Sequence, residues 1–100
     1  METRARVNCL TIVAESVIEQ RLIESLRRVG ARGWTITAAY GKGPRDRRVS
    51  DMEGGNIRIE ILASDETTQL MWGVLESDYF PHYAVIAWEQ EVVVARRDLF

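Results

Sequence analysis

Two amphipathic helix patterns, each set between strand-like segments, constrain the fold of this chain more than any other feature of its sequence. Apolar side chains recur at helical spacing over 18–29 and again over 65–75, so each segment has one apolar face. Four other segments are rich in β-branched and aromatic residues, which is typical of strands. These segments are 6–14, 34–40, 57–61 and 83–94. The sequence therefore predicts the order β-α-β-β-α-β.

Capping residues set the expected ends of the first helix. Ser16 stands three residues before Glu19, the spacing of a capping box, in which each side chain binds the backbone amide of the other residue. Gly30 and Gly33 follow the last apolar residue, as glycines do at helix C-termini. We therefore expect a helix that begins just after Ser16 and ends near Gly30.

The second helix and the last strand have their own expected limits. Ser64 or Asp65 is expected to cap the helix, and a turn closed by Pro81 is expected over 78–82. An interruption of the last strand is expected near 89–91. The expected apolar stripe of the second helix is Leu70, Met71, Val74 and Leu75.

The predicted order of elements is that of a ferredoxin-like α+β sandwich, in which two helices cover one face of a sheet. With 100 residues the chain has the length of one domain, so a single domain over 1–100 is expected. Isoleucines alternate with polar residues in 57–61, which predicts one buried side and one side that meets solvent or a partner. Because the second sheet face also needs cover, the apolar last strand favours association between copies.

Composition excludes several classes of protein. A formal net charge of −2 argues against a dedicated binder of duplex DNA, which is usually basic overall. No apolar run reaches the roughly 18 residues of a membrane-spanning helix, and no secretory signal is recognised at the N-terminus. The single cysteine excludes an intramolecular disulfide and a cysteine-based zinc site. A cytoplasmic protein is expected.

The segment 41–55 is the main functional candidate. At about 15 residues it is longer than the usual connection of about 4–6. It combines glycines with four cations, and freed backbone amides beside cations are what a di- or triphosphate requires. The cations are Lys42, Arg45, Arg47 and Arg48. The glycine spacing and the Ser or Thr after lysine that define a Walker A sequence are missing. A solvated hairpin loop accounts equally well for this composition.

Other chemically capable residues have simpler structural explanations. Cys9 lies among apolar neighbours and is expected to be a buried, inert thiol. His82 is the only histidine, and a surface or turn position is favoured over a catalytic one. Glu89 and Glu91 share one strand face, where solvation or ion pairing is favoured over acid–base chemistry. The tryptophans are expected to anchor the core or an interface; they are Trp34, Trp72 and Trp88.

Four stretches carry a family resemblance when they are taken together. They are Gly33-Trp-Thr-Ile-Thr, Gly41-Lys-Gly-Pro-Arg-Asp-Arg-Arg, Asn56-Ile-Arg-Ile-Glu-Ile-Leu and Tyr79-Phe-Pro-His-Tyr-Ala-Val-Ile. With them, the chain resembles PII-like signalling proteins, and most of all the SbtB type associated with bicarbonate transport. The resemblance extends over about residues 6–96, and its most specific part is the glycine- and arginine-rich stretch that begins at Gly41.

The resemblance implies a homotrimer of ferredoxin-like subunits with adenine nucleotides in the clefts between them. Segment 41–55 would be the T-loop, mobile when the site is empty and ordered by a ligand or partner. The implied phosphate-binding residues are Gly41, Lys42, Gly43, Arg45 and Arg48. The implied adenine- and ribose-binding residues are Thr35, Ile59, Glu60 and Ile61 of one chain, with Tyr83, Ala84, Val85 and Ile86 of its neighbour.

The function implied by the resemblance is regulatory and non-catalytic, with no cofactor, no metal and no nucleic acid. The implied ligand is AMP, ADP, ATP or cyclic AMP, with bicarbonate as a candidate co-ligand. The implied partner is a membrane transport system, plausibly an inorganic-carbon transporter, contacted through the T-loop. Two alternatives stay open: a small oligomeric enzyme with slow nucleotide hydrolysis that uses Glu60 or Glu89 with His82, and a structural trimer like the divalent-cation-tolerance proteins.

Overall fold

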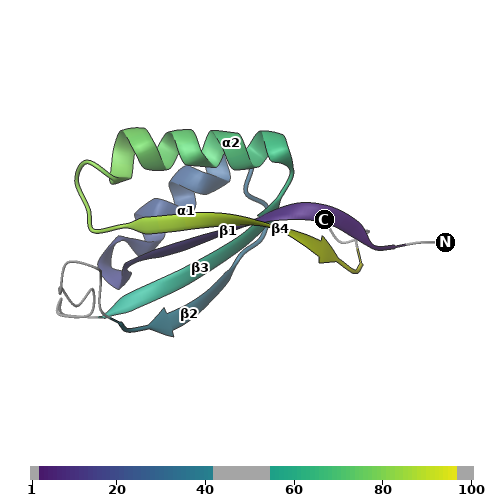
Figure 1. The fold of residues 1–100 in the computed structure, drawn as a ribbon. Coiled ribbons are helices and arrows are strands. Elements are labelled where there is room, and N and C mark those ends of the chain that lie inside the picture. Colours follow the sequence, from purple (N-terminus) through teal and green to yellow (C-terminus); the bar gives the residue numbers. More distant parts are fainter. Residues whose placement is uncertain (1–2, 42–54, 97–100) are drawn as a thin grey trace.

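The computed structural model of the chain describes residues 3–41 and 55–96 (Figure 1). A 3-10 helix, η1 (Ser16–Ile18), leads into the first α-helix, and a π-helix, η3 (Leu75–Tyr79), continues the second. The strands are β1 (Ala5–Glu15), β2 (Thr35–Ala39), β3 (Asn56–Ala63) and β4 (Ile86–Val94), and the α-helices are α1 (Glu19–Arg28) and α2 (Asp65–Val74).

The strands form one antiparallel sheet in the order β2-β3-β1-β4, and both α-helices lie on the same face of it (Figure 1). This arrangement confirms the predicted ferredoxin-like α+β sandwich. Strand β1 is central because it pairs with β3 on one side and with β4 on the other. At its N-terminal end, Ala5–Val7 pairs with β4 alone, so β1 and β4 continue as a two-stranded ribbon past the end of β3.

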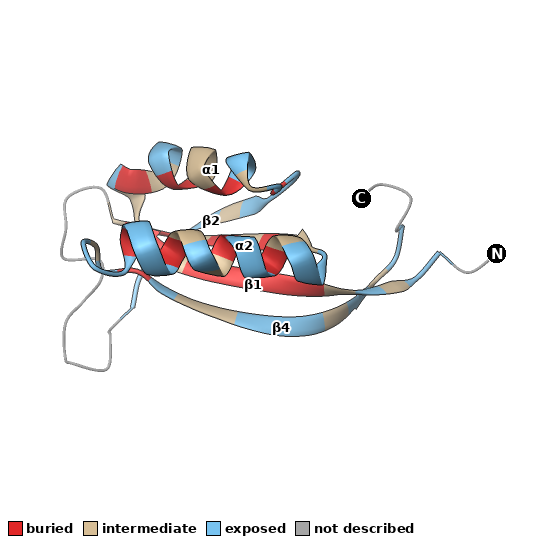
Figure 2. Cartoon of the chain, turned by 90° about the horizontal axis from the view of Figure 1, so that it is seen from above, coloured by how far each residue is buried: buried red, intermediate tan, exposed pale blue. Residues whose placement is uncertain are grey.

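The hydrophobic core lies between the sheet and the helices, and Figure 2 shows the buried residues on the sides of α1 and α2 that face the sheet. The predicted alternation in 57–61 is confirmed, because the isoleucines of β3 point to this core. Leu70 is an exception to the predicted helix stripe and is 49% exposed. The buried positions of α2 are Thr68 and Met71, and Leu70 is rotated by about 100° from Met71 around the helix axis. The large, fully buried members of the core include Leu10, Ile12, Leu22, Leu26, Ile59, Ile61, Met71 and Leu75.

The start of α1 differs from the predicted capping box. Ser16 opens the 3-10 turn one step before α1, and the N-cap residue of α1 is Ile18, which makes no side-chain cap hydrogen bond. The Ser16 hydroxyl instead donates to the carbonyl oxygen of Gly55 at 2.8 Å, and the Ser16 amide donates to the same oxygen at 3.0 Å. Ser16 therefore ties the end of β1 to the residue that precedes β3.

The start of α2 follows the prediction, whereas the next two elements do not. The Ser64 hydroxyl accepts a hydrogen bond from the Thr67 amide at 3.2 Å and caps the helix. The expected turn over 78–82 begins later, because η3 extends the helix to Tyr79. Strand β4 is not interrupted near 89–91, since each residue there has a paired partner in β1.

Most of the chemically capable side chains for which the sequence favoured a structural role are engaged in packing or in polar contacts. Cys9 is buried, as expected. Glu91 forms an ion pair with Arg6 at 2.9 Å, and Glu89 accepts a hydrogen bond from the indole of Trp72 at 2.7 Å. None of the three tryptophans is fully buried. Trp72 packs against the core, Trp34 is 38% exposed, and Trp88 lies on the sheet face opposite the helices.

Gly30 closes α1 in a conformation that residues with a Cβ rarely adopt. Its φ is +121°, and the next amide, that of Ala31, donates back to the carbonyl oxygen of Leu26 at 3.1 Å. A Cβ added at Gly30 would lie 3.1 Å from the hydroxyl oxygen of Thr67 in α2. A Cβ at Gly33 would meet no atom within 4 Å. Gly30 thus lets the end of α1 approach the start of α2 closely.

We predict that Gly30→Ala lowers the free energy of unfolding by about 1–3 kcal/mol, because the backbone is strained and the added methyl group crowds Thr67. Gly33→Ala is the matched control and should change it by less than about 0.5 kcal/mol. Urea denaturation of the two variants measures both values. Equal losses in the two variants would contradict this account of the helix end.

Candidate ligand-binding site on the open sheet face

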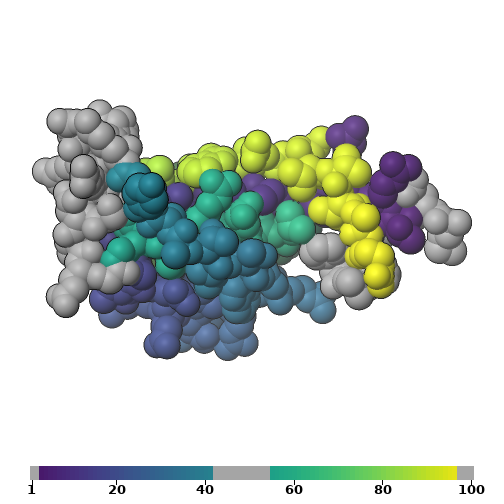
Figure 3. Space-filling view, turned by 90° about the horizontal axis from the view of Figure 1, so that it is seen from below, coloured from purple at the N-terminus to yellow at the C-terminus, as the bar shows by residue number. Residues whose placement is uncertain are grey.

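No described helix covers the second face of the sheet, which Figure 3 shows in a space-filling view. The strand register places side chains on this open face in rows that cross all four strands. One row contains Thr35, Glu60, Thr11 and Trp88, from β2 to β4. The next row contains Thr37, Arg58, Val13 and Ile86 in the same order. The face is therefore polar over β2 and β3 and more apolar over β1 and β4.

Arg58 joins the two halves of the open face. Its guanidinium carbon lies 5.4 Å from the centre of the Trp88 ring, in cation–π geometry. Its Nε lies 3.8 Å from a carboxylate oxygen of Glu60, and both side chains are close to half exposed. An exposed ion pair of this length contributes about 0–1 kcal/mol, so either partner can exchange the other for a ligand.

Glu60 and Thr35 are paired residues on adjacent strands, so their side chains lie next to each other on the open face. A carboxylate accepts hydrogen bonds, and a hydroxyl both donates and accepts them. Together they can recognise an amino or hydroxyl group that is held against the sheet. The structure thus brings together two of the residues predicted for base binding.

Two other residues predicted for base binding, Ile59 and Ile61, have side chains on the opposite side of β3 from Glu60. Both side chains are fully buried in the core beneath the helices and hold β3 against them. On the open face these two positions present backbone and not side chains.

The four residues predicted to reach the ligand from the neighbouring chain, 83–86, differ in burial: two pack in or against the core and two are exposed. Val85 belongs to the core, and Tyr83 packs against it with its hydroxyl bound by Arg21. Ala84 is exposed, and Ile86 is 52% exposed on the open face. Of the four, only Ala84 and Ile86 offer side chains to a ligand or a second chain.

Of the predicted phosphate-binding residues, only Gly41 is described. It lies two residues after the end of β2, beyond Tyr40, and is exposed. Lys42, Gly43, Arg45 and Arg48 lie outside the described residues.

Asn56 is an unusual residue that the sequence did not single out as part of the site. It begins β3, opposite Ala39 on one side and Glu15 on the other, and it is 4% exposed. Neither its amide nitrogen nor its amide oxygen has a hydrogen-bond partner within the described part of the chain. In the sequence Asn56 is one of several polar residues in an alternating strand. Its burial could not be predicted, because it depends on tertiary packing.

Residues 3–41 and 55–96 lack two kinds of feature. No group of three or more His, Cys, Asp or Glu side chains there could hold a metal ion. No helix there has the length and apolar character needed to cross a membrane.

Comparison with known proteins gives consistent matches over nearly the whole chain. The family model of nitrogen regulatory protein P-II matches residues 7–99. A protein of Thermus thermophilus described as a PII-like signalling protein is 43% identical, with a TM-score of 0.84 over 100% of this chain and 99% of its own.

Two more distant structures share the fold. One is CPII of Thiomonas intermedia, a nitrogen regulatory PII-like protein bound to ADP, AMP and bicarbonate. It is 20% identical, with a TM-score of 0.77 over 93% of this chain and 97% of its own. The other is GlnK of Bacillus subtilis in complex with ATP, 18% identical, with a TM-score of 0.50 over 90% of this chain and 84% of its own.

The two buried asparagines make a matched pair for testing the unpartnered amide. Asn8 is 6% exposed, and its amide donates to Asp65 at 2.6 Å and to Thr68 at 3.4 Å. We predict that Asn8→Leu lowers the free energy of unfolding by about 1–3 kcal/mol, because Asp65 and Thr68 lose their partner. We predict that Asn56→Leu raises it by about 1 kcal/mol, because a desolvated amide is removed. Chemical denaturation compares the two, and a loss in Asn56→Leu as large as that in Asn8→Leu would contradict the assignment.

Proposed function

This chain belongs to the nitrogen regulatory protein P-II family, and on that premise we propose that it is a non-catalytic signalling protein that binds adenine nucleotides between identical subunits. The observation that carries the proposal is the open sheet face. It sets a paired hydroxyl and carboxylate beside an apolar surface that one chain leaves uncovered. The family match and the nucleotides bound to CPII and GlnK support the choice of ligand.

We propose that three copies assemble with their open faces toward a common axis. The apolar side chains over β1 and β4, such as Val13 and Ile86, favour burial against another copy. The ribbon of β1 and β4 past β3 favours the same assembly, because an isolated two-stranded ribbon is only marginally stable in water. The proposed clefts lie where the β2 edge of one copy meets the residues around Ala84 of the next.

In each cleft the nucleotide would contact two chains. Thr35 and Glu60 would bind the base or ribose by hydrogen bonds, and Ala84 and Ile86 of the neighbouring chain would pack against it. Backbone amides and cations of the T-loop would bind the phosphates. These residues are Gly41, Lys42, Gly43, Arg45 and Arg48. A rigid sheet would therefore select the base, and the loop would respond to the number of phosphates.

Bicarbonate is the proposed co-ligand. The Asn56 carboxamide, which has no hydrogen-bond partner among residues 3–41 and 55–96, has a donor and an acceptor side by side. Bicarbonate carries an O–H donor beside a negatively charged acceptor. Formate lacks that O–H group and would leave the Asn56 oxygen unpaired. The bicarbonate bound to CPII supports the same choice.

The proposed partner is a membrane transport protein for inorganic carbon, contacted from the cytoplasm through the T-loop. The resemblance to the SbtB type supports this partner. Ligand binding would regulate the contact by favouring one arrangement of the T-loop, which requires different affinities for the arrangements.

No observation favours the enzymatic alternative. Each of its proposed groups contacts another side chain. Glu60 lies 3.8 Å from Arg58, Glu89 accepts a hydrogen bond from Trp72, and His82 stands edge-on to Tyr83 with ring centres 6.4 Å apart. Incubation with ATP and measurement of released phosphate provide a direct check of this alternative.

We predict that Arg45→Ala and Arg48→Ala each weaken ADP binding by about 1–3 kcal/mol, because each removes a charge-assisted hydrogen bond to phosphate. Arg47→Ala removes the same charge from the same segment and is the control, with affinity expected to change by less than threefold. Isothermal titration of ADP, AMP, ATP and cyclic AMP measures these affinities. The ADP titration is repeated in bicarbonate and in formate.

Three results would contradict parts of the proposal. If the wild-type protein binds no nucleotide, the proposed function is wrong. Equal effects of all three arginine substitutions would leave only a general charge effect. If ADP binds with the same affinity in bicarbonate and in formate, bicarbonate is not a co-ligand.

A further inference from the structure

We propose that Arg21 in α1 is a positioning residue for the nucleotide site, because it holds the turn 80–85 through two tyrosines. The inference rests on the proposed function, in which Ala84 and Ile86 face a nucleotide held partly by the neighbouring chain. Arg21 lies on the helix side of the sheet and would not itself touch the ligand. Its effect would pass through Tyr79 and Tyr83.

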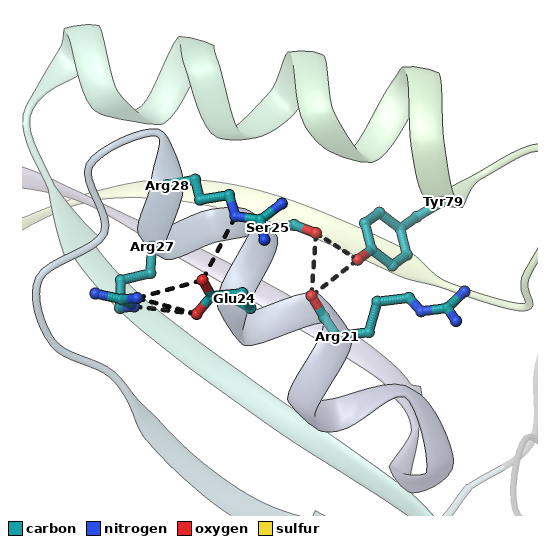
Figure 4. Close-up of polar contacts among 6 residues, drawn as sticks. All are labelled: Arg21, Glu24, Ser25, Arg27, Arg28 and Tyr79. Atoms are coloured by element: carbon teal, nitrogen blue, oxygen red, sulfur yellow. Dashed lines mark hydrogen bonds and ion pairs between the residues drawn. The ribbon is translucent and has the colours of Figure 1, made fainter.

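Arg21 contacts both tyrosines, with its backbone to one and its side chain to the other. Its carbonyl oxygen accepts a hydrogen bond from the Tyr79 hydroxyl at 3.0 Å, and the Ser25 hydroxyl lies 2.7 Å from the same tyrosine oxygen (Figure 4). Its guanidinium donates to the Tyr83 hydroxyl at 2.7 Å. The two tyrosine rings are 5.7 Å apart, so they form one packed unit.

This unit fixes the backbone that leads into β4. The Tyr79 carbonyl oxygen accepts hydrogen bonds from the amides of His82 at 3.0 Å and Tyr83 at 2.9 Å. The Tyr83 carbonyl oxygen accepts one from the Val85 amide at 2.9 Å. Tyr79 itself is almost fully buried and cannot move without opening the core. The position of Ala84 therefore depends on where Tyr83 is held.

The Tyr83 end of this turn is less firmly held than the Tyr79 end. Tyr83 is only partly buried, and the Arg21 bond to its hydroxyl is exposed. This exposed hydrogen bond ties the Tyr83 hydroxyl to α1, in addition to the packing of the Tyr83 ring against Tyr79 and the core. Breaking it would loosen the outer part of the turn while Tyr79 stays in the core.

Neighbouring arginines of α1 provide a contrast. Arg27 and Arg28 both bind Glu24, with nitrogen–oxygen distances of 3.2 and 3.4 Å (Figure 4). The hydrogen bond from Arg27 and the positive charges of both arginines hold the pKa of the Glu24 carboxyl below its usual value. These two arginines are engaged within α1, whereas Arg21 reaches the turn before β4.

The test measures ADP affinity by isothermal titration and backbone protection by hydrogen exchange in the peptide that contains residues 80–87, both on the full chain. We expect Arg21→Ala to weaken ADP binding about three- to tenfold, the range of one lost hydrogen bond, and to speed exchange in that peptide. Tyr83→Phe should have the same effect, because it removes the same bond from the other side. Arg21→Lys keeps a donor and should recover most of the affinity, and Arg27→Ala is the matched control without effect.

The outcomes separate this inference from the proposed function. Faster exchange with weaker ADP binding in Arg21→Ala, together with recovery in Arg21→Lys, supports the positioning role. Unchanged hydrogen exchange of residues 80–87 in Arg21→Ala would show that Arg21 does not hold the turn. Faster exchange with unchanged ADP affinity would show that the turn does not affect nucleotide binding. If the wild-type protein binds no nucleotide, the proposed function fails and the positioning role with it, while the exchange data still decide whether Arg21 anchors the turn. An equal loss of thermal stability in Arg21→Ala and Arg27→Ala excludes global unfolding as the cause of any difference between them.

Discussion

Pairing of β1 with β3 on one side and β4 on the other is the interaction on which the rest of the structure depends. It sets the register of three strands at once, and therefore decides which side chains enter the core and which face outward. A shift of one residue would exchange Ile59 for Glu60 and leave a carboxylate under the helices. The fully buried Leu10, Ile12 and Ile59 hold that register against such a shift, because burial of each apolar side chain contributes about 1.5–3 kcal/mol.

The site follows from the same register. Glu60 is on the open face because Ile59 and Ile61 are in the core, and Thr35 lies beside it because β2 pairs with β3 at that position. The candidate site is therefore assembled by backbone pairing and needs no cavity within a single chain. No described helix covers this face, and in the proposed assembly the apolar side chains over β1 and β4 are buried against another copy of the chain.

The sequence predicted the order of the elements and the buried side of β3, but not every local end: the capping box at Ser16 and the turn over 78–82 differ in the structure. The alternation of Ile57, Ile59 and Ile61 predicted which side of β3 is buried, and Ser64 was correctly expected as a helix cap. The same alternation turns the side chains of Ile59 and Ile61 to the core, although the family resemblance placed both residues at the base-binding site. Ser16 bonds to Gly55, 39 positions away, and Arg21 bonds to Tyr83, 62 positions away. No local pattern distinguishes such contacts from capping or solvation.

The central claim is that several copies complete the open sheet face, and the mass of the protein in solution tests it most directly. Light scattering coupled to size-exclusion chromatography gives that mass without reference to molecular shape. We expect a mass three times that of the 11.4 kDa chain. A mass equal to that of one chain at micromolar concentration, with or without ADP, would contradict it, because the proposed cleft would then have only one of its two walls.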